Sequence, residues 1–113
     1  MIKVSLIITI VREGWGDKVL TASMKAGAAG GTILMGRGLG VHEQQKILGI
    51  PIEPEKEIVL SVVYTDKSEA ILQEIVQACE LEKPGAGIAF VVPVKKVVGV
   101  SHLLGNSEGG MSE

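Results

Sequence analysis

Five stretches of the chain are rich in β-branched residues and predict β-strands. Residues 2–11 alternate polar and apolar at their start and then become almost continuously apolar, which is typical of a strand buried on both faces. The middle of residues 28–40 predicts a strand that the chain enters and leaves through glycines. Residues 56–64 and 88–93 have the same β-branched composition, and residues 96–100 predict a shorter strand.

Two segments carry apolar residues at helical spacing and predict α-helices. The first begins at Asp17, a residue type that caps helices, and ends at Gly27, where a left-handed cap needs no Cβ. The second begins at Asp66, which forms a capping box with Glu69. The apolar face of this second helix carries Ile71, Leu72, Ile75, Val76 and Cys79.

These elements follow the order β-α-β-loop-β-α-β and predict an α+β fold, the ferredoxin-like βαββαβ sandwich. In this arrangement two helices cover one face of an antiparallel sheet. Residues 41–55 show little periodicity and contain two prolines, so we expect a long loop there. The other face of the sheet carries too many aliphatic residues to stay in water. Self-association through the sheets is the simplest way to cover that face.

Composition and charge restrict the function. The chain has 113 residues, enough for one domain, with a formal net charge of −2 and 3% aromatic residues. The negative net charge argues against a basic surface, and the few aromatic residues argue against stacking of bases, so we do not expect nucleic-acid binding. No apolar run reaches the roughly 18–20 residues that cross a bilayer, and no cleavage site precedes the first strand, so we expect a cytoplasmic protein without membrane insertion. We expect the lone Cys79 to be a small buried hydrophobe.

The chain lacks the residue patterns that are typical of catalysis and of metal binding. It has no nucleophile–base pair and no paired carboxylates, so we expect a protein that is not an enzyme. His42 and His102 have no Cys, Asp or His neighbours at ligand spacing, which argues against a metal site.

Two glycine-rich segments resemble the PII signal-transduction superfamily. Residues 83–94 are similar to the family's second signature, in which a glycine-rich turn leads into a Phe-Val strand. Thr32 and the later run Arg37-Gly38-Leu39-Gly40 resemble the strand and lead-in to the family's large effector loop, the T-loop. The resemblance covers roughly residues 1–100 and keeps the order of the elements.

The resemblance implies a homotrimer whose sheets face a central barrel, with adenine nucleotides bound as effectors in clefts between neighbouring subunits. It implies no required cofactor, and a T-loop that contacts a target, often a membrane transport protein or a metabolic enzyme. We expect a PII-like domain over residues 1–104, a T-loop over about residues 38–56 and a flexible tail over residues 105–113. The family's nucleotide-binding positions correspond to Ile7, Thr32, Arg37, Gly38, Leu39, Gly40, Gly85, Ala86, Gly87 and Ile88.

The chain departs from the family at four cationic positions. Val41 and Ile88 stand where the family has an arginine and a lysine, and Gly99 and Ser101 stand for two arginines of the last strand. Charge-assisted contacts of this kind contribute about 1.5–3 kcal/mol each. We therefore expect AMP, ADP or cyclic AMP as the effector rather than ATP. The residues that compensate in part for the lost charge are Lys83, Arg37 and His102.

The expected loop contains an apolar hexapeptide, residues 47–52, within otherwise polar sequence. This segment folds back over the ligand cleft or docks into another protein, and docking agrees with the way the family uses its loop. The partner-binding residues are then Ile47, Leu48, Ile50 and Ile52. The loop is shorter than in nitrogen-regulating members and has no tyrosine to be nucleotidylated, so the chain resembles a divergent PII-like protein.

Two other functions are compatible with the same residues. One is a ligand-independent interaction module whose hexapeptide docks constitutively. The other is a trimeric metal-binding protein of the related cation-tolerance type, which shares the ferredoxin-like fold. The absence of clustered metal ligands argues against this second alternative.

Overall fold

The computed structural model describes residues 3–40, 45–47, 50–52 and 54–99. Along the chain its elements are β1 (Val4–Arg12), α1 (Gly16–Lys25), β2 (Thr32–Arg37), β3 (Gln45–Ile47), β4 (Ile50–Ile52), β5 (Glu55–Tyr64), α2 (Thr65–Cys79) and β6 (Gly87–Val94).

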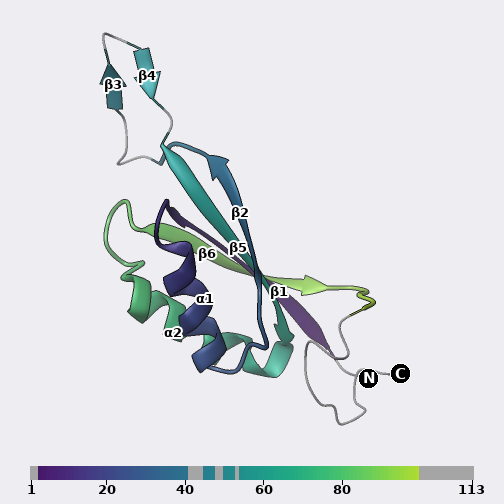
Figure 1. Cartoon of the computed structure of the whole chain (residues 1–113). Helices are drawn as coiled ribbons and strands as arrows, with labels where there is room; N and C mark the ends of the chain where they lie inside the picture. The colour runs from purple at the N-terminus through teal and green to yellow at the C-terminus, as the bar shows by residue number, and fades with distance from the viewer. Residues whose placement is uncertain (1–2, 41–44, 48–49, 53, 100–113) are drawn as a thin grey trace.

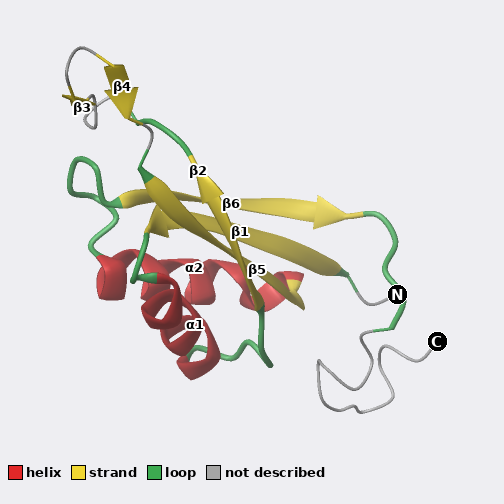
Figure 2. Cartoon of the chain, turned by 45° about the horizontal axis from the view of Figure 1, so that its top comes forward, coloured by secondary structure: helices red, strands yellow, loops and turns green. Residues whose placement is uncertain are grey.

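Four strands form one antiparallel sheet in the order β2-β5-β1-β6. Both helices lie on the same face of this sheet (Figures 1 and 2). Without the short strands β3 and β4, the order of elements is βαββαβ. The ferredoxin-like α+β fold predicted from the sequence is therefore confirmed.

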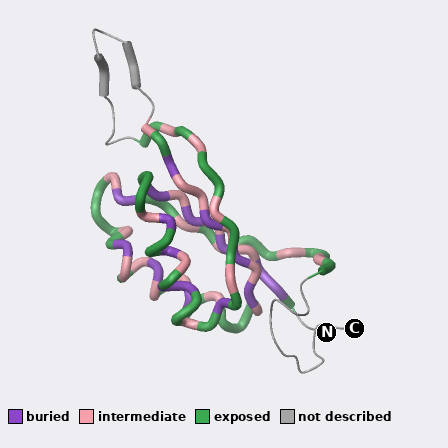
Figure 3. The backbone as a smooth tube through the Cα atoms, in the orientation of Figure 1, coloured by how far each residue is buried: buried purple, intermediate pink, exposed green. Residues whose placement is uncertain are grey.

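The core lies between the sheet and the two helices. Because side chains alternate along a strand, the odd-numbered residues from Ser5 to Val11 and from Val59 to Val63 face the helices and are buried, while the even-numbered residues between them are only half-buried (Figure 3). Burial of a valine or isoleucine side chain of this kind stabilises a fold by about 1.5–3 kcal/mol. The strand residues of the core include Ile7, Val11, Val59 and Val63, and the helix residues include Val19, Ala22, Ile71, Ile75 and Cys79.

The other face of the sheet is apolar and is not covered by either helix. Its register aligns Ile10 with Ile58 on one side and with Ile88 on the other, and Ile8 in the same way with Leu60 and Phe90. The most exposed of these side chains is Ile88, at 54% of its full accessibility. The expectation of an uncovered aliphatic face is confirmed. We call this surface the apolar face, and its residues are Leu6, Ile8, Ile10, Leu34, Ile58, Leu60, Val62, Ile88, Phe90 and Val92.

The predicted N-terminal helix caps are wrong. Helix α1 begins at Gly16 after Trp15, and α2 begins at Thr65 after Tyr64, and neither preceding residue caps its helix with a side chain. Asp17 and Asp66 therefore lie inside the first turns, so Asp66 does not form a capping box with Glu69. At these positions the carboxylates still interact favourably with the positive end of the helix dipole.

Two predictions about irregular segments also need correction. Within the expected loop, β3 and β4 pair as an antiparallel hairpin, with Gln45 opposite Ile52. The predicted strand over residues 96–100 is absent from residues 96–99, and residue 100 lies outside the described chain. The reason is the register of the sheet. Strand β6 ends at Val94, which pairs with Val4, the first residue of β1, so β1 provides no partner for a longer strand.

A carboxylate from β5 takes the place of the missing cap at α1. The backbone N–H groups of Gly14 and Gly16 donate hydrogen bonds to the two oxygens of Glu57, at 3.0 and 2.6 Å. A Cβ atom at Gly16 would overlap Glu57 Oε1, so the close approach needs a glycine at this position. This contact ties the start of β5 to the turn between β1 and α1.

Replacement of Glu57 by alanine is expected to lower the free energy of unfolding by about 1–3 kcal/mol, because two backbone donors lose their acceptor. Urea denaturation of the Glu57→Ala protein measures this loss. Glu55→Ala, on the same strand but with an exposed side chain, is the matched control and is expected to change stability little. Equal stability of the two variants would contradict the proposed role of Glu57.

Candidate functional site

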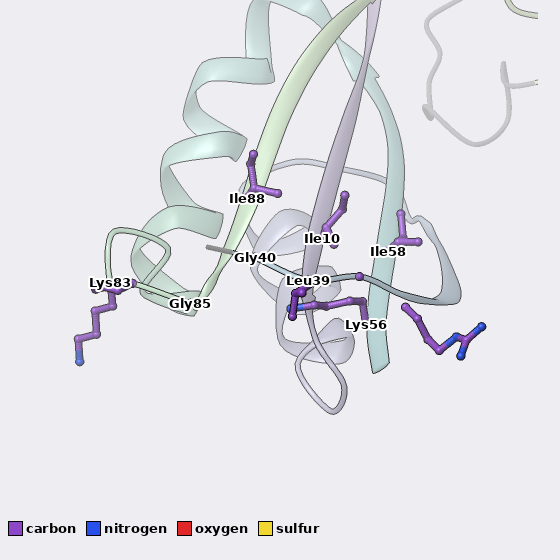
Figure 4. Close-up of a pocket in the computed structure, with 12 residues that line it drawn as sticks. Ile10, Leu39, Gly40, Lys56, Ile58, Lys83, Gly85 and Ile88 are labelled. Atoms are coloured by element: carbon purple, nitrogen blue, oxygen red, sulfur yellow. The ribbon is translucent and has the colours of Figure 1, made fainter. Parts of the chain in front are cut away.

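A cavity of about 540 Å³ lies at one end of the apolar face. It is located where β1 and β2 end and where β5 and β6 begin. Its lining residues are Ile10, Arg37, Gly38, Leu39, Gly40, Lys56, Ile58, Lys83, Pro84, Gly85, Gly87 and Ile88, and Figure 4 shows them as sticks.

Two glycine-containing segments bring backbone to the cavity. Residues 38–40 leave the end of β2 next to the start of β5, where the N–H of Gly38 donates to the carbonyl of Pro54 at 3.2 Å. Residues 83–86 form a turn in which the N–H of Ala86 donates to the carbonyl of Lys83 at 3.1 Å. Both segments come from sequence regions more than forty residues apart, and the antiparallel sheet places them at the same end.

Gly87 is required by the close approach of β6 to β1. Its φ is +147°, and a Cβ atom there would lie 2.5 Å from the carbonyl oxygen of Ile10 and 3.0 Å from Val11 Cγ1. Gly85 has a φ of +78° but open space around it. The turn therefore depends on Gly87 for packing and conformation, and on Gly85 for conformation alone.

The walls of the cavity are apolar and its charged lining is positive. Ile10, Ile58 and Ile88 project from β1, β5 and β6, and Leu39 lies across the opening from them (Figure 4). Arg37, Lys56 and Lys83 also line the cavity, and none of its described lining residues is acidic. Such a cavity suits a ligand with a flat apolar part and an anionic group.

The three cations differ in their surroundings. Lys56 is buried, with 9% of its surface accessible. The ammonium of Lys83 instead lies 2.9 Å from the carboxylate of Glu80, and its side chain points away from the apolar walls (Figure 4). The pKa of Glu80 is lowered, first by the hydrogen bond from Lys83 and then by the charge of that lysine.

Most of the residues predicted to bind nucleotide come together in this cavity. The predicted residues that line it are Arg37, Gly38, Leu39, Gly40, Gly85, Gly87 and Ile88. Ala86 is buried in the turn between Gly85 and Gly87 and does not line the cavity.

Ile7 and Thr32 lie elsewhere. The prediction placed Ile7 beside a bound adenine, but its side chain is 1% exposed and packs in the core on the helix side of the sheet. Ile10, which belongs to the opposite face of the same strand, lines the cavity instead. Thr32 lines a second hollow of about 210 Å³ at the other end of β2, together with Ala29, Gly30, Gly31, Leu60 and Val62.

Sequence reasoning missed Ile10, Lys56, Ile58 and Pro84 as cavity residues. A usable signal existed for the three strand residues, because alternation puts Lys56 and Ile58 on one face of β5 and Ile10 on the matching face of β1. That signal depends on the pairing of β1 with β5, which no single strand reveals.

The remaining candidates that the structure describes do not line the cavity. Ile47, Ile50 and Ile52 belong to β3 and β4, while Leu48, Val41, Ser101 and both histidines lie outside the described chain. Among the described residues, no group of three His, Cys, Asp or Glu side chains could hold a metal ion.

Other features of the described chain do not extend the site. Burial raises the pKa of the Cys79 thiol, against a smaller opposing effect of Lys18, so this core residue is a poor nucleophile. In the part that the structure describes, no helix is long and apolar enough to span a membrane.

Comparison with known proteins gives one match. The family model described as nitrogen regulatory protein P-II matches residues 4–102, a range that contains the lining residues of the cavity. A search of the curated proteins found no match.

The two glycines of the turn are expected to differ in their sensitivity to substitution. Gly85→Ala places an alanine at positive φ in open space and is expected to cost about 1–2 kcal/mol of stability. Gly87→Ala also forces the new Cβ against the carbonyl of Ile10, and we expect a loss of about 3 kcal/mol or more. Urea denaturation of both variants measures the difference, and equal losses would contradict this account of the turn.

Proposed function

The chain belongs to the nitrogen regulatory protein P-II family, and we propose that it is a homotrimeric sensor of an adenine nucleotide that acts on a protein partner through its T-loop. The observation that carries the proposal is the cavity in which residues 38–40 and the turn of residues 83–87 meet. These are the two segments whose sequences resemble the family's T-loop base and second signature.

The apolar face supports assembly into a trimer. It combines exposed side chains of β6 with half-buried side chains of β1 and β5, and no described helix covers it. A monomer rarely exposes a continuous apolar surface of this kind. Burial of such a surface contributes about 25 cal/mol for each Å² removed from water. A trimer whose sheets face a central axis, as the family implies, buries this face.

The shape and chemistry of the cavity support an adenine nucleotide. Its volume of about 540 Å³ is within the range of small-molecule sites. The isoleucine walls offer flat apolar contact to a purine ring. Backbone N–H groups of a glycine turn approach an anion without obstruction by Cβ atoms, which suits a phosphate group.

The charge of the cavity supports a ligand with few phosphates. Arg37 and Lys56 line it, but Ile88 provides an apolar side chain where the family has a lysine. Gly99, at a position where the family has an arginine, has no side chain at all. AMP, ADP and cyclic AMP need fewer cations than ATP, and they are the ligands we propose.

The second hollow supports a cleft between subunits. Thr32 lies at the opposite end of β2 from Arg37, so it cannot reach a ligand in the cavity of its own chain. Both hollows open on the same face of the sheet, which the trimer brings together around one axis. A cyclic trimer joins unlike ends of neighbouring subunits, so the Thr32 hollow of one subunit would complete the cavity of the next.

The hairpin of β3 and β4 supports a role in partner binding. It lies beyond the ends of β2 and β5, away from the helices (Figure 1). Within the described chain, β3 and β4 pair only with each other, so each has one edge that is available to a strand from another protein. A membrane transport protein or a metabolic enzyme is the class of partner that we propose.

Calorimetric titration of the purified protein with AMP, ADP, cyclic AMP and ATP tests the proposal, with the mass in solution measured alongside. We expect a mass of three chains and saturable binding of at least one of the first three ligands. ATP is expected to bind at least about tenfold more weakly, because the cations for further phosphates are missing. A trimer that ignores all four ligands would contradict the sensor and favour the ligand-independent interaction module.

The control for this titration is a pair of matched variants. Leu39→Glu introduces a carboxylate into the cavity at a position outside the apolar face, and it is expected to abolish binding of the adenylate by repulsion of its phosphate. Val98→Glu introduces the same charge at an 81% exposed position outside the cavity and is expected to leave binding unchanged.

A further inference from the structure

Lys83 is part of the cavity wall, but its charge is directed elsewhere. Its ammonium lies 2.9 Å from Glu80 Oε1, and both side chains are more than half exposed, at 70% and 54%. Figure 4 shows the side chain extended away from Ile10, Ile58 and Ile88. The lysine is therefore placed at the cavity while its charge is neutralised by a residue outside the lining.

The backbone holds Glu80 in position for this contact. Glu80 ends α2 in the left-handed conformation, with a φ of +55°, and it is the one described residue other than glycine with a positive φ. The N–H of Lys83 donates to the carbonyl of Glu80 at 3.0 Å, which closes a turn between the two residues. The ion pair and the turn together keep the lysine beside the carboxylate.

Lys83 is the one cationic side chain in the glycine turn that could bind a phosphate. Among residues 83–88, Lys83 is the only basic side chain, and Ile88 follows the second turn glycine directly. Arg37 and Lys56 belong to the opposite wall, on β2 and β5. Lys83 is therefore the basic residue nearest in sequence to a phosphate bound at the N–H groups of Gly85 and Gly87.

We propose that Lys83 binds the phosphate of the ligand. In the free protein its ammonium pairs with Glu80, and the phosphate of the bound ligand displaces this carboxylate. This inference rests on the proposed nucleotide site and adds a specificity-determining residue to it. The lysine stem is flexible and its three donors are equivalent, so it can exchange one anion for another without movement of the backbone.

The energetics favour the exchange. An exposed ion pair three residues apart shifts an equilibrium by only about twofold to fivefold. A charge-assisted hydrogen bond to phosphate is stronger, and its loss weakens binding by about tenfold to a hundredfold. Glu80 therefore reduces the affinity for a phosphate slightly and does not block it.

Calorimetry of the full-length protein with AMP and with adenosine tests the role of Lys83. Lys83→Gln is expected to weaken AMP binding about tenfold or more and to leave adenosine binding unchanged. Lys83→Arg keeps the charge and is expected to restore most of the affinity. Glu80→Gln keeps the size of the side chain and is expected to strengthen AMP binding about twofold to fivefold, with no effect when Lys83 is already glutamine.

The pKa of Glu80 gives a second readout that a purely structural lysine would not move. The hydrogen bond and charge of Lys83 lower this pKa in the free protein, with a smaller effect from Lys18. Saturation with AMP is expected to return it toward its ordinary value, because Lys83 leaves the carboxylate, and NMR titration of the side-chain carboxyl measures the change.

The outcomes separate this inference from the proposed function. Wild-type protein that binds AMP, with unchanged affinity in Lys83→Gln and an unchanged Glu80 pKa, would overturn the role of Lys83 alone. Wild-type protein that binds no adenylate would overturn the nucleotide site, and the inference with it.

Discussion

The structure depends on a sheet that is apolar on both faces. Alternation in β1 and β5 sends one set of valines and isoleucines to the helices and another set to the uncovered side. The two helices can bury only the first set. The second set needs another surface, and the proposed trimer supplies it from identical chains. The fold, the proposed assembly and the candidate site thus follow from one pattern, because the cavity lies at the end of the uncovered face.

The same alternation places neighbouring residues of β5 on opposite faces of the sheet, where they make different contacts. Glu57 faces the helix side and accepts the N–H groups of Gly14 and Gly16, while Lys56 and Ile58 line the cavity. The start of β5 is therefore held from the helix side by an internal carboxylate. On the cavity side, Gly87 allows β6 to approach β1 closely enough to close the wall. Strands form the floor of the site, and two glycine-containing segments form its rim.

Much of this arrangement could be predicted from the sequence, and the failures have physical causes. The strand and helix order followed from local patterns, and the two glycine segments pointed to the residues that now line the cavity. Ile7, which the resemblance placed at the nucleotide, lies in the core, and the apolar run of β1 does not reveal which set of residues faces the helices. The caps at Asp17 and Asp66 failed because propensity does not locate the first helical residue, and at α1 a distant residue, Glu57, satisfies the donors instead. Lys56 was missed because its position depends on strand pairing across the sheet.

The central claim is that each ligand cleft is built from the cavity of one subunit and the Thr32 hollow of the next. A mixed trimer tests it most directly, with Thr32→Trp filling one half-site and Leu39→Glu blocking the other. Each variant alone is expected to lose adenylate binding. Co-expression of the two in equal amounts is expected to restore about a quarter of the clefts. In a random cyclic trimer, about one cleft in four pairs the intact cavity of one variant with the intact Thr32 hollow of the other. Full binding by Thr32→Trp alone, or no recovery in the mixture, would contradict the shared cleft.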